Sequence, residues 1–195
     1  MGREIKSSRS QDHLFFARKW LAAPGSVGSV VPSSRYLTRA MLAAAQVSSC
    51  HVIAEFGPGT GVMTNEIIRR MPAAARLLIF EIDPQFATRL RQRVVDPRVM
   101  VFNESAEGLR RRLSGLQLDH VDCIVSGIPF GALSPADAQP ILEIAHDALR
   151  PGGRFVAFQY TPFRLSLFRS YFSSLRIARL VVRNLPPSLV VVGTR

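Results

Sequence analysis

Short apolar runs alternate along the chain with segments whose apolar positions recur every three or four residues. The runs predict seven strands, at 52–55, 77–80, 99–102, 121–125, 154–160, 176–183 and 188–194. Between them, helical spacing appears at 62–71, 84–94, 110–112, 135–149 and 164–172, with a kink predicted at Pro140. This alternation is typical of an α/β fold with a doubly wound, mostly parallel sheet of seven strands.

A helix is predicted at 10–22, ahead of the first strand. Its apolar residues form a broad arc opposite most of its basic residues, although Phe15 lies among the basic ones. Two interpretations remain open. The arc packs on the domain, or the helix lies in the headgroup region of a bilayer.

A second added helix is predicted to begin at Ser33 or Ser34 and to end near Gln46. Both serines are caps by residue type, and the same hydroxyls are candidates for binding an anion. We divide the chain into 1–48, a tail with added helices that serves membrane association and as an active-site lid, and one domain at 49–195.

Three glycines at alternate positions, Gly57, Gly59 and Gly61, join the first strand to the following helix, and Glu55 precedes them. Glycines let backbone approach a ligand closely, and the helix start offers free N–H groups and a positive dipole end. The dinucleotide fingerprint needs a third glycine where Val62 stands. The spacing therefore predicts a different nucleotide-like ligand, although glycine turns also join strands to helices without any such role.

Polar or glycine residues follow five predicted strands, at 55–61, 81–83, 103–106, 126–130 and 159–161. In a parallel sheet these strand ends meet at one edge, where ligands bind. Glu81 lies twenty residues beyond Gly61, and an acid at about this distance bonds ribose hydroxyls in nucleotide-binding α/β units. The five strand ends together predict one site.

The formal charge of +11 predicts an anionic partner, which is nucleic acid, an anionic membrane surface or an acidic substrate. Cys50 and Cys123 adjoin apolar runs, so we expect buried, reduced thiols and a cytoplasmic protein. No secretory signal, no membrane-spanning run and no metal-ligand spacing is present in the sequence.

The region 50–160 resembles class I S-adenosylmethionine-dependent methyltransferases, which include the rRNA adenine dimethyltransferases. The whole chain is more similar to the bacterial phospholipid N-methyltransferases, which convert phosphatidylethanolamine to phosphatidylcholine. The segments that carry the resemblance are 27–35, 55–61, 81–84, 126–130 and 183–187. The resemblance implies a Rossmann-like fold and S-adenosyl-L-methionine as cofactor.

The same resemblance implies roles for individual residues. Glu55 is expected near the amino acid end of the cofactor and Glu81 at the ribose, with Ile82 against the adenine. The residues expected to bind cofactor are Ser33, Ser34, Glu55, Gly57, Pro58, Gly59, Thr60, Gly61, Glu81, Ile82, Asp83, Ser105, Ala106, Ser126 and Gly127. Ser105 replaces an Asp found in many relatives, and Gly127 replaces the Asn with which the rRNA enzymes orient a flipped adenine.

The predicted reaction is methylation of phosphatidylethanolamine and its methylated intermediates at the inner face of the cell membrane, by a peripherally attached monomer. The partners are a phospholipid headgroup, with its phosphate near Ser33, Ser34 or Arg35, and an anionic membrane surface that binds 10–22. The predicted catalytic residues are three aromatics, Tyr36, Phe130 and Tyr160, whose ring faces can stabilise a methylated cation. The alternative is that they are only packing residues of the core. The alternatives are adenine N6-methylation of rRNA or DNA, another amine lipid such as ornithine lipid, and a binding module without catalysis.

Overall fold

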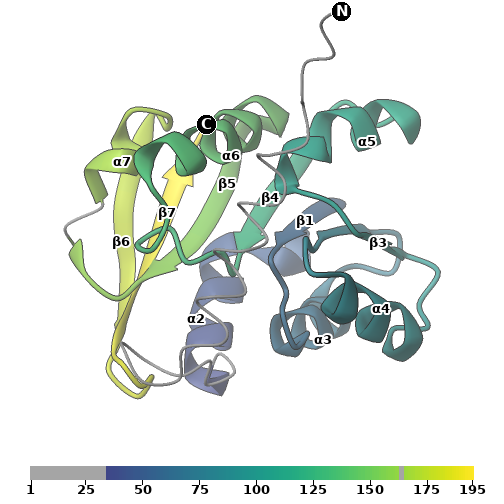
Figure 1. Ribbon diagram of the computed structural model, residues 1–195, viewed down its shortest axis with the longest axis horizontal. Coiled ribbons are helices and arrows are strands. Elements are labelled where there is room, and N and C mark those ends of the chain that lie inside the picture. The colour runs from purple at the N-terminus through teal and green to yellow at the C-terminus, as the bar shows by residue number, and fades with distance from the viewer. Residues whose placement is uncertain (1–33, 163–164) are drawn as a thin grey trace, which may run out of the picture.

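The computed structural model describes residues 34–162 and 165–195, which form one seven-stranded sheet with helices on both faces (Figure 1). The strands are β1 (Val52–Phe56), β2 (Arg76–Phe80), β3 (Val99–Phe102), β4 (Val121–Ser126), β5 (Leu149–Gln159), β6 (Ser174–Val181) and β7 (Ser188–Thr194). The helices are α2 (Arg35–Ala45), α3 (Val62–Arg70), α4 (Pro84–Arg93), α5 (Leu109–Gly115), α6 (Pro135–Ala148) and α7 (Leu165–Arg169), with single 3₁₀ turns at η1 (Val47–Ser49) and η2 (Ala106–Gly108).

The strand order is β3-β2-β1-β4-β5-β7-β6. The five strands from β3 to β5 are parallel, and β7 runs antiparallel between β5 and β6. The predicted Rossmann-like, mostly parallel sheet is thus confirmed. Because β1 lies between β2 and β4, the winding reverses there, and ligands of such sheets bind beyond the carboxyl ends at this point.

Side-chain caps fix where three helices begin. The Ser34 hydroxyl accepts a hydrogen bond from Leu37 N at 3.2 Å, so Ser34 is the cap of α2, one of the two caps predicted. Asp83 caps α4, and Ser134 caps α6 in the same way. The kink predicted at Pro140 does not end the helix, because α6 continues through it from Pro135 to Ala148.

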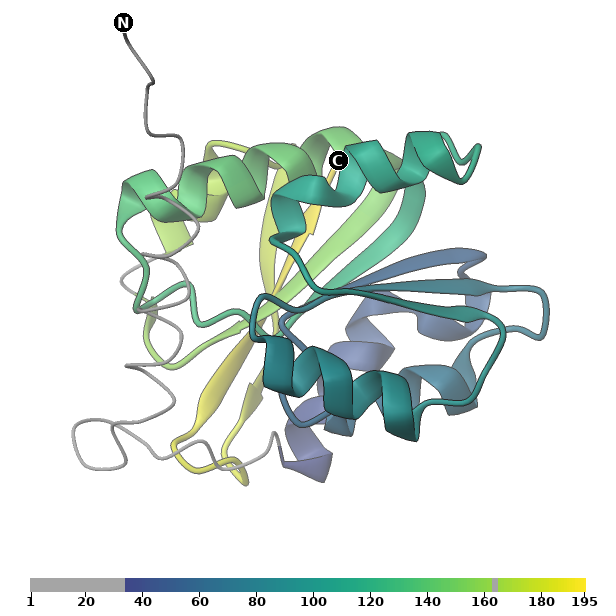
Figure 2. The same ribbon diagram turned by 45° about the vertical axis from the view of Figure 1, so that its right-hand side comes forward.

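Each face of the sheet has its own hydrophobic core. Helices α2, α3 and α4 cover one face, and α5, α6 and α7 cover the other (Figure 2). Leu37 and Met41 of α2 pack in the same core as Ile53 of β1, so no boundary in packing separates α2 from the domain that we predicted to begin at residue 49. Cys50 and Cys123 are buried free thiols, as expected.

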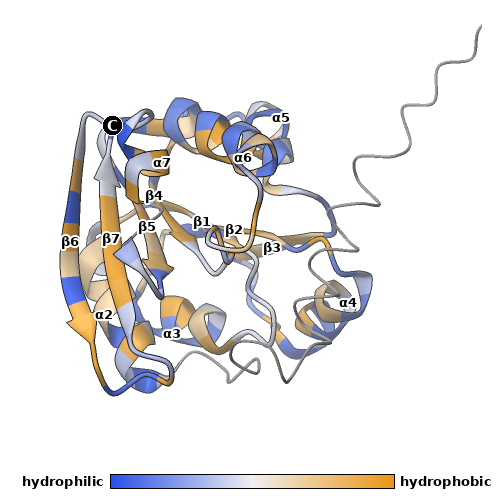
Figure 3. Cartoon of the chain, turned by 60° about the vertical axis from the view of Figure 1, so that its left-hand side comes forward, coloured by the Kyte–Doolittle hydropathy of each residue, from blue (hydrophilic) through white to orange (hydrophobic). Residues whose placement is uncertain are grey.

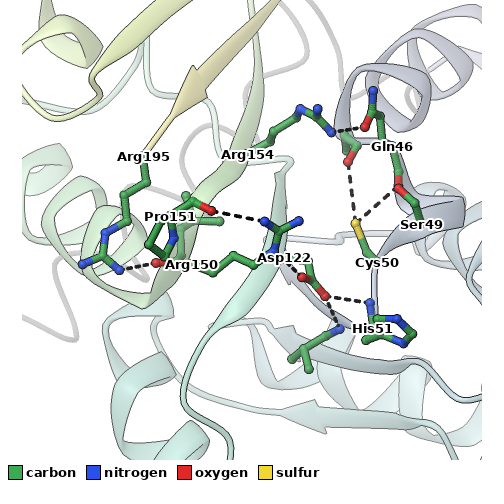
Figure 4. Close-up of polar contacts among 12 residues, drawn as sticks. Gln46, Ser49, Cys50, His51, Asp122, Arg150, Pro151, Arg154 and Arg195 are labelled. Carbon is green, nitrogen blue, oxygen red and sulfur yellow. Dashed lines mark hydrogen bonds and ion pairs between the residues drawn. The ribbon is translucent and has the colours of Figure 1, made fainter.

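Asp122 holds three strands together at the edge opposite the carboxyl ends (Figure 4). Its carboxylate accepts hydrogen bonds from His51 N at 2.7 Å, Val52 N at 2.9 Å and Arg150 Nε at 2.6 Å. Burial by itself raises the pKa of Asp122, but the bonds from Val52, Arg150 and His51 outweigh it and lower the pKa.

We expect Asp122→Asn to destabilise the fold by about 1–3 kcal/mol, because an amide replaces a charged acceptor of two backbone N–H groups. The lowered pKa means that the wild-type contribution is present above the unfolded-state pKa and is lost as the pH falls through the folded-state pKa. Urea unfolding at pH 7 and pH 3 measures this effect. Equal stability losses at both pH values would contradict the assignment.

Candidate cofactor and acceptor site

The loop from β1 to α3 has the backbone that the glycine pattern predicts. Gly57, Gly59 and Gly61 have φ angles of 62°, 56° and 81°, in the left-handed region that favours glycine. Gly57 N donates to Phe80 O at 2.9 Å, which ties the loop to the end of β2. The loop is therefore held at the edge where the winding reverses.

Glu81, at the end of β2, is buried and supports the loop directly. One carboxylate oxygen accepts from Gly59 N at 3.1 Å, and the other accepts from Asp83 N at 2.9 Å. Burial raises the pKa of Glu81, and these backbone bonds oppose that shift. Each oxygen keeps a further lone pair, so the carboxylate can still accept from the ribose hydroxyls that we assign to it.

Asn103, at the end of β3, is a site residue that sequence reasoning did not single out. Its side-chain amide donates to Glu81 O at 2.9 Å and to Ile82 O at 3.1 Å. These two bonds fix the backbone carbonyls of Glu81 and Ile82, just beyond the end of β2. Only the position of Asn103 in a polar strand end signalled its role.

Glu55, at the end of β1, has no exposed surface and is only half satisfied. Oε2 accepts from the Thr64 hydroxyl at 2.7 Å, whereas Oε1 is buried without a hydrogen-bond partner among the described residues. Burial raises the pKa of Glu55 to about 8, with a smaller contribution from the Glu81 charge, and the Thr64 bond opposes the shift. A buried carboxyl with a free oxygen is suited to receive a cationic donor.

Gly127, just after β4, touches the glycine loop. A Cβ at this position would lie 2.4 Å from Gly57 O and 3.3 Å from the Met63 methyl carbon. Gly127 N also donates to Phe56 O at 2.7 Å. Because of this close approach, no side chain fits at this position unless the backbone of the glycine loop shifts.

The other residues expected at the cofactor lie along the same edge. Ser126 is buried, and its hydroxyl accepts from Ile128 N at 3.2 Å. Ser105 caps η2 and donates to the Glu107 carboxylate at 2.9 Å. Pro58 and Ala106 are buried, Ile82 is half-buried, Thr60 is exposed, and Asp83 caps α4. Ser33 and the segment 10–22 lie outside the described residues.

Phe130, one of the three predicted catalytic aromatics, does not face the site. It has no exposed surface, and its ring packs against Phe155 and Phe168 with centroids 5.8 and 5.3 Å away. The prediction mistook a core aromatic for a site aromatic, because a strand-end position does not determine which way the side chain turns.

Tyr36 lies at the site edge, but its ring is occupied by cations. The guanidinium carbons of Arg35 and Arg183 lie 5.0 and 5.3 Å from its ring centroid, and Arg35 donates to its hydroxyl at 3.0 Å. A hydrogen bond from Arg35, and a weaker one from Arg183, lower the pKa of Tyr36. Two cations on one ring disfavour a third, so the predicted role of Tyr36 against a methylated cation does not fit.

Tyr160 remains as the aromatic with an accessible face. It follows β5 at the carboxyl edge, is 38% exposed, and its ring meets Phe158 at 5.4 Å. Burial raises the pKa of its hydroxyl. Gln159, the residue before it, was missed by sequence reasoning. It is 3% exposed, and its amide nitrogen has no partner within the described part of the chain.

Comparison with known proteins identifies the enzyme class. Residues 53–153 match the family model described as a methyltransferase domain. The chain belongs to this methyltransferase family. It is 27% identical to an ornithine lipid N-methyltransferase from Singulisphaera acidiphila, over 91% of this chain and 93% of that protein.

Two further similarities are narrower, one in sequence coverage and one in being a likeness of fold alone. The methyltransferase is 27% identical to ribosomal RNA small subunit methyltransferase A from Acaryochloris marina, over 66% of this chain and 46% of that protein. Its fold resembles precorrin-6y C5,15-methyltransferase from Geobacter metallireducens, with a TM-score of 0.63 at 15% identity, over 87% of this chain and 93% of that one.

S-adenosylmethionine is the cofactor of this methyltransferase, and the residues present fit it. The free Oε1 of Glu55 suits the ammonium of an amino acid, and two residues without side chains, Gly57 and Gly127, meet where the glycine loop passes the end of β4. The described residues include no group of His, Cys, Asp or Glu side chains that could hold a metal ion. Nor does any helix among them have the length and apolarity needed to cross a membrane.

Proposed function

We propose that this methyltransferase N-methylates the headgroup amine of a membrane lipid, with phosphatidylethanolamine and its methylated intermediates as acceptors. Ornithine lipid is the second candidate, because the protein named for that substrate is similar over almost the whole of both chains. Both lipids carry an amine close to one anionic group. An amine close to an anionic group fits the part of the site that we assign to the methyl acceptor.

The observation that carries the proposal is the cluster Arg35–Tyr36–Arg183 at the carboxyl edge. Neither guanidinium pairs with a carboxylate anywhere in 34–162 and 165–195. Both guanidinium groups are exposed and both pack against the ring of Tyr36, which limits the conformations that the two side chains can adopt. Such a pair suits a phosphate diester or a carboxylate on the acceptor.

The chain contributes mainly binding and alignment to the reaction. When bound, the cofactor supplies a methyl group on sulfonium sulfur, already activated for transfer to an amine. We assign Glu55, Glu81 and the glycine loop to hold that group, and the arginine pair to hold the anionic group of the acceptor. Tyr160 offers an aromatic face for the methylated ammonium.

The structure of the β4 end favours a lipid amine over a nucleobase. Gly127 cannot carry a side chain, and the likeness to the ribosomal RNA enzyme covers less than half of that protein. We propose that the enzyme works peripherally on the cytoplasmic face of the cell membrane. In this proposal segment 10–22 contributes to attachment and the enzyme is a monomer.

The test offers the purified protein and radiolabelled S-adenosylmethionine three acceptors: phosphatidylethanolamine vesicles, ornithine lipid vesicles and ribosomal RNA. We expect label in lipid, and the preferred lipid identifies the anionic group. Arg35→Ala should raise KM for the lipid by about tenfold with little change in kcat, because a charge-assisted contact is lost. Label in RNA and not in lipid would refute the proposal.

A further inference from the structure

The turn between β6 and β7, residues 182–187, exposes large apolar side chains. Val182 is 68% exposed and Leu185 is 78% exposed. The apolar surface continues along β6, where Ile177 is 49% and Leu180 is 56% exposed. Figure 3 shows β6 at the outer edge of the sheet, banded in orange and blue.

A β-bulge places the apolar residues of β6 on one face. Ile177 pairs with Val191 and Leu180 pairs with Leu189, and the register shifts between Ile177 and Arg179. Val191 and Leu189 are two residues apart, so their partners share a face even though those partners are three residues apart. Without the bulge, Ile177 and Leu180 would point to opposite faces.

Arginines occupy the other face of the same strand. Arg176 and Arg179 pair with Val192 and Val190, which lie in the core beneath α2. Both arginines are exposed and neither has a carboxylate partner among the described residues. Arg183 adds a third positive charge within the turn.

The turn is fixed to the acceptor side of the site. Asn184 is buried, and its side-chain oxygen accepts from Ser34 N, at the start of α2, at 3.3 Å. Its amide nitrogen donates to Pro186 O and to the Ser188 hydroxyl, both at 2.9 Å. The exposed apolar tip is therefore held beside Tyr36 and the arginine pair, and both Figure 1 and Figure 2 show it next to one end of α2.

We propose that the turn 182–187 and the adjoining β6 edge form a docking surface for an anionic lipid bilayer. Val182 and Leu185 enter the headgroup–acyl boundary, and Arg176 and Arg179 meet lipid phosphates. The surface brings the rim of the acceptor site to the membrane, so a lipid amine reaches it without leaving the bilayer. This inference rests on the proposed lipid acceptor.

A second copy of the chain is a poorer occupant of the same edge. Strand addition needs a flat edge, and the bulge together with Arg176 and Arg179 disfavours it. The overall charge of +11 also repels a second copy and attracts an anionic surface.

The test measures co-sedimentation of the full chain with vesicles of phosphatidylglycerol and phosphatidylcholine, in the absence of cofactor. The apolar variant is Val182→Ser with Leu185→Ser, and its control is Val95→Ser, an apolar residue that is 92% exposed between α4 and β3. The charge variant is Arg176→Ala with Arg179→Ala, and its control is Arg89→Ala with Arg93→Ala on α4.

We expect the apolar variant to bind these vesicles about tenfold more weakly and the charge variant at least about tenfold more weakly, with both controls close to wild type. Raised salt should weaken only the part of vesicle binding that depends on Arg176 and Arg179. Wild-type binding by the two test variants, or equal losses in the controls, would overturn the docking surface. Circular dichroism melting excludes unfolding as the cause of any loss.

Turnover separates this inference from the proposed function. With phosphatidylethanolamine dispersed in neutral detergent, the apolar variant should match wild type, whereas on vesicles it should be about tenfold slower. If no lipid is methylated in either medium, the proposed function fails while the binding measurements still decide the surface. A wild-type dimer that Leu185→Ser dissociates in sedimentation velocity would overturn the membrane assignment in favour of self-association.

Discussion

Gly127→Ala is expected to weaken S-adenosylmethionine binding by at least about a hundredfold. The added Cβ would lie 2.4 Å from Gly57 O, which is backbone and has no flexible end that can move aside. The turn after β1 would have to shift away from β4, and Gly57 would lose its position against the end of β2. With this turn displaced, the cofactor loses both the close approach of the glycine backbone and the free N–H groups at the start of α3.

Isothermal titration calorimetry measures this loss, with Gly115→Ala as the matched control. Nothing lies within 4 Å of a Cβ at Gly115, which is in α5, so this variant should bind as wild type and be as stable or slightly more stable. Gly59→Ala adds a graded test, because its Cβ meets nothing within 4 Å and only its φ of 56° is strained.

We expect Gly59→Ala to fold and to lose less affinity than Gly127→Ala. Circular dichroism reports whether Gly127→Ala keeps its secondary structure. A folded Gly127→Ala variant with wild-type affinity would show that the contact between the two loops does not shape the cofactor site.

The sheet and the cofactor edge were predictable from the sequence because both depend on local patterns. Apolar runs bury in parallel strands whatever surrounds them, and the residue after each run necessarily falls at the carboxyl edge. Gly57, Glu81 and Gly127 lie at this edge, as those patterns predict, and their contacts with the cofactor stay predictions. Of the arginine pair on the proposed acceptor side, only Arg35 was named for this role from the sequence, because Arg183 and Asn184 join it from a segment far away in the chain.

Two misjudged aromatics show where the local argument stops. The guanidinium of Arg183 lies over the Tyr36 ring, and Asn184, which follows Arg183, accepts a hydrogen bond from Ser34 N, 150 positions away in sequence. These contacts form only when β7 pairs antiparallel with β5 and brings the two segments together. Phe130 follows a strand like a site residue, yet its ring turns into the core formed with Phe155 and Phe168. Side-chain direction after a strand depends on packing that sequence periodicity does not encode.

Glu55→Gln is expected to weaken cofactor binding about ten- to a hundredfold at pH 8 and to remove its pH dependence. The pKa of about 8 means that the ligand-free protein holds Glu55 protonated at pH 7. A cationic ammonium is bound best by the deprotonated form, so binding releases a proton below pH 8. Wild-type affinity should therefore rise up to tenfold per pH unit and level off above pH 8.

Stability should follow the opposite course in the ligand-free protein. The unfolded chain gives up this proton near pH 4.5, whereas the folded chain keeps it until about pH 8. The contribution of Glu55 to stability is thus full below pH 4.5 and is lost as the pH rises towards 8. Glu55→Gln removes this loss and still accepts the Thr64 bond, so its melting temperature should gain on wild type as the pH rises.

Thermal melting from pH 5 to 9, and calorimetry in buffers of different ionisation enthalpy, measure the two effects separately. Glu66→Gln is the control, because Glu66 lies on α3 and pairs at the surface with Arg69 and Arg70. It should change neither the pH slope nor the affinity. If Glu55→Gln kept the wild-type affinity and the wild-type dependence of affinity on pH, Glu55 Oε1 would not be the ammonium site.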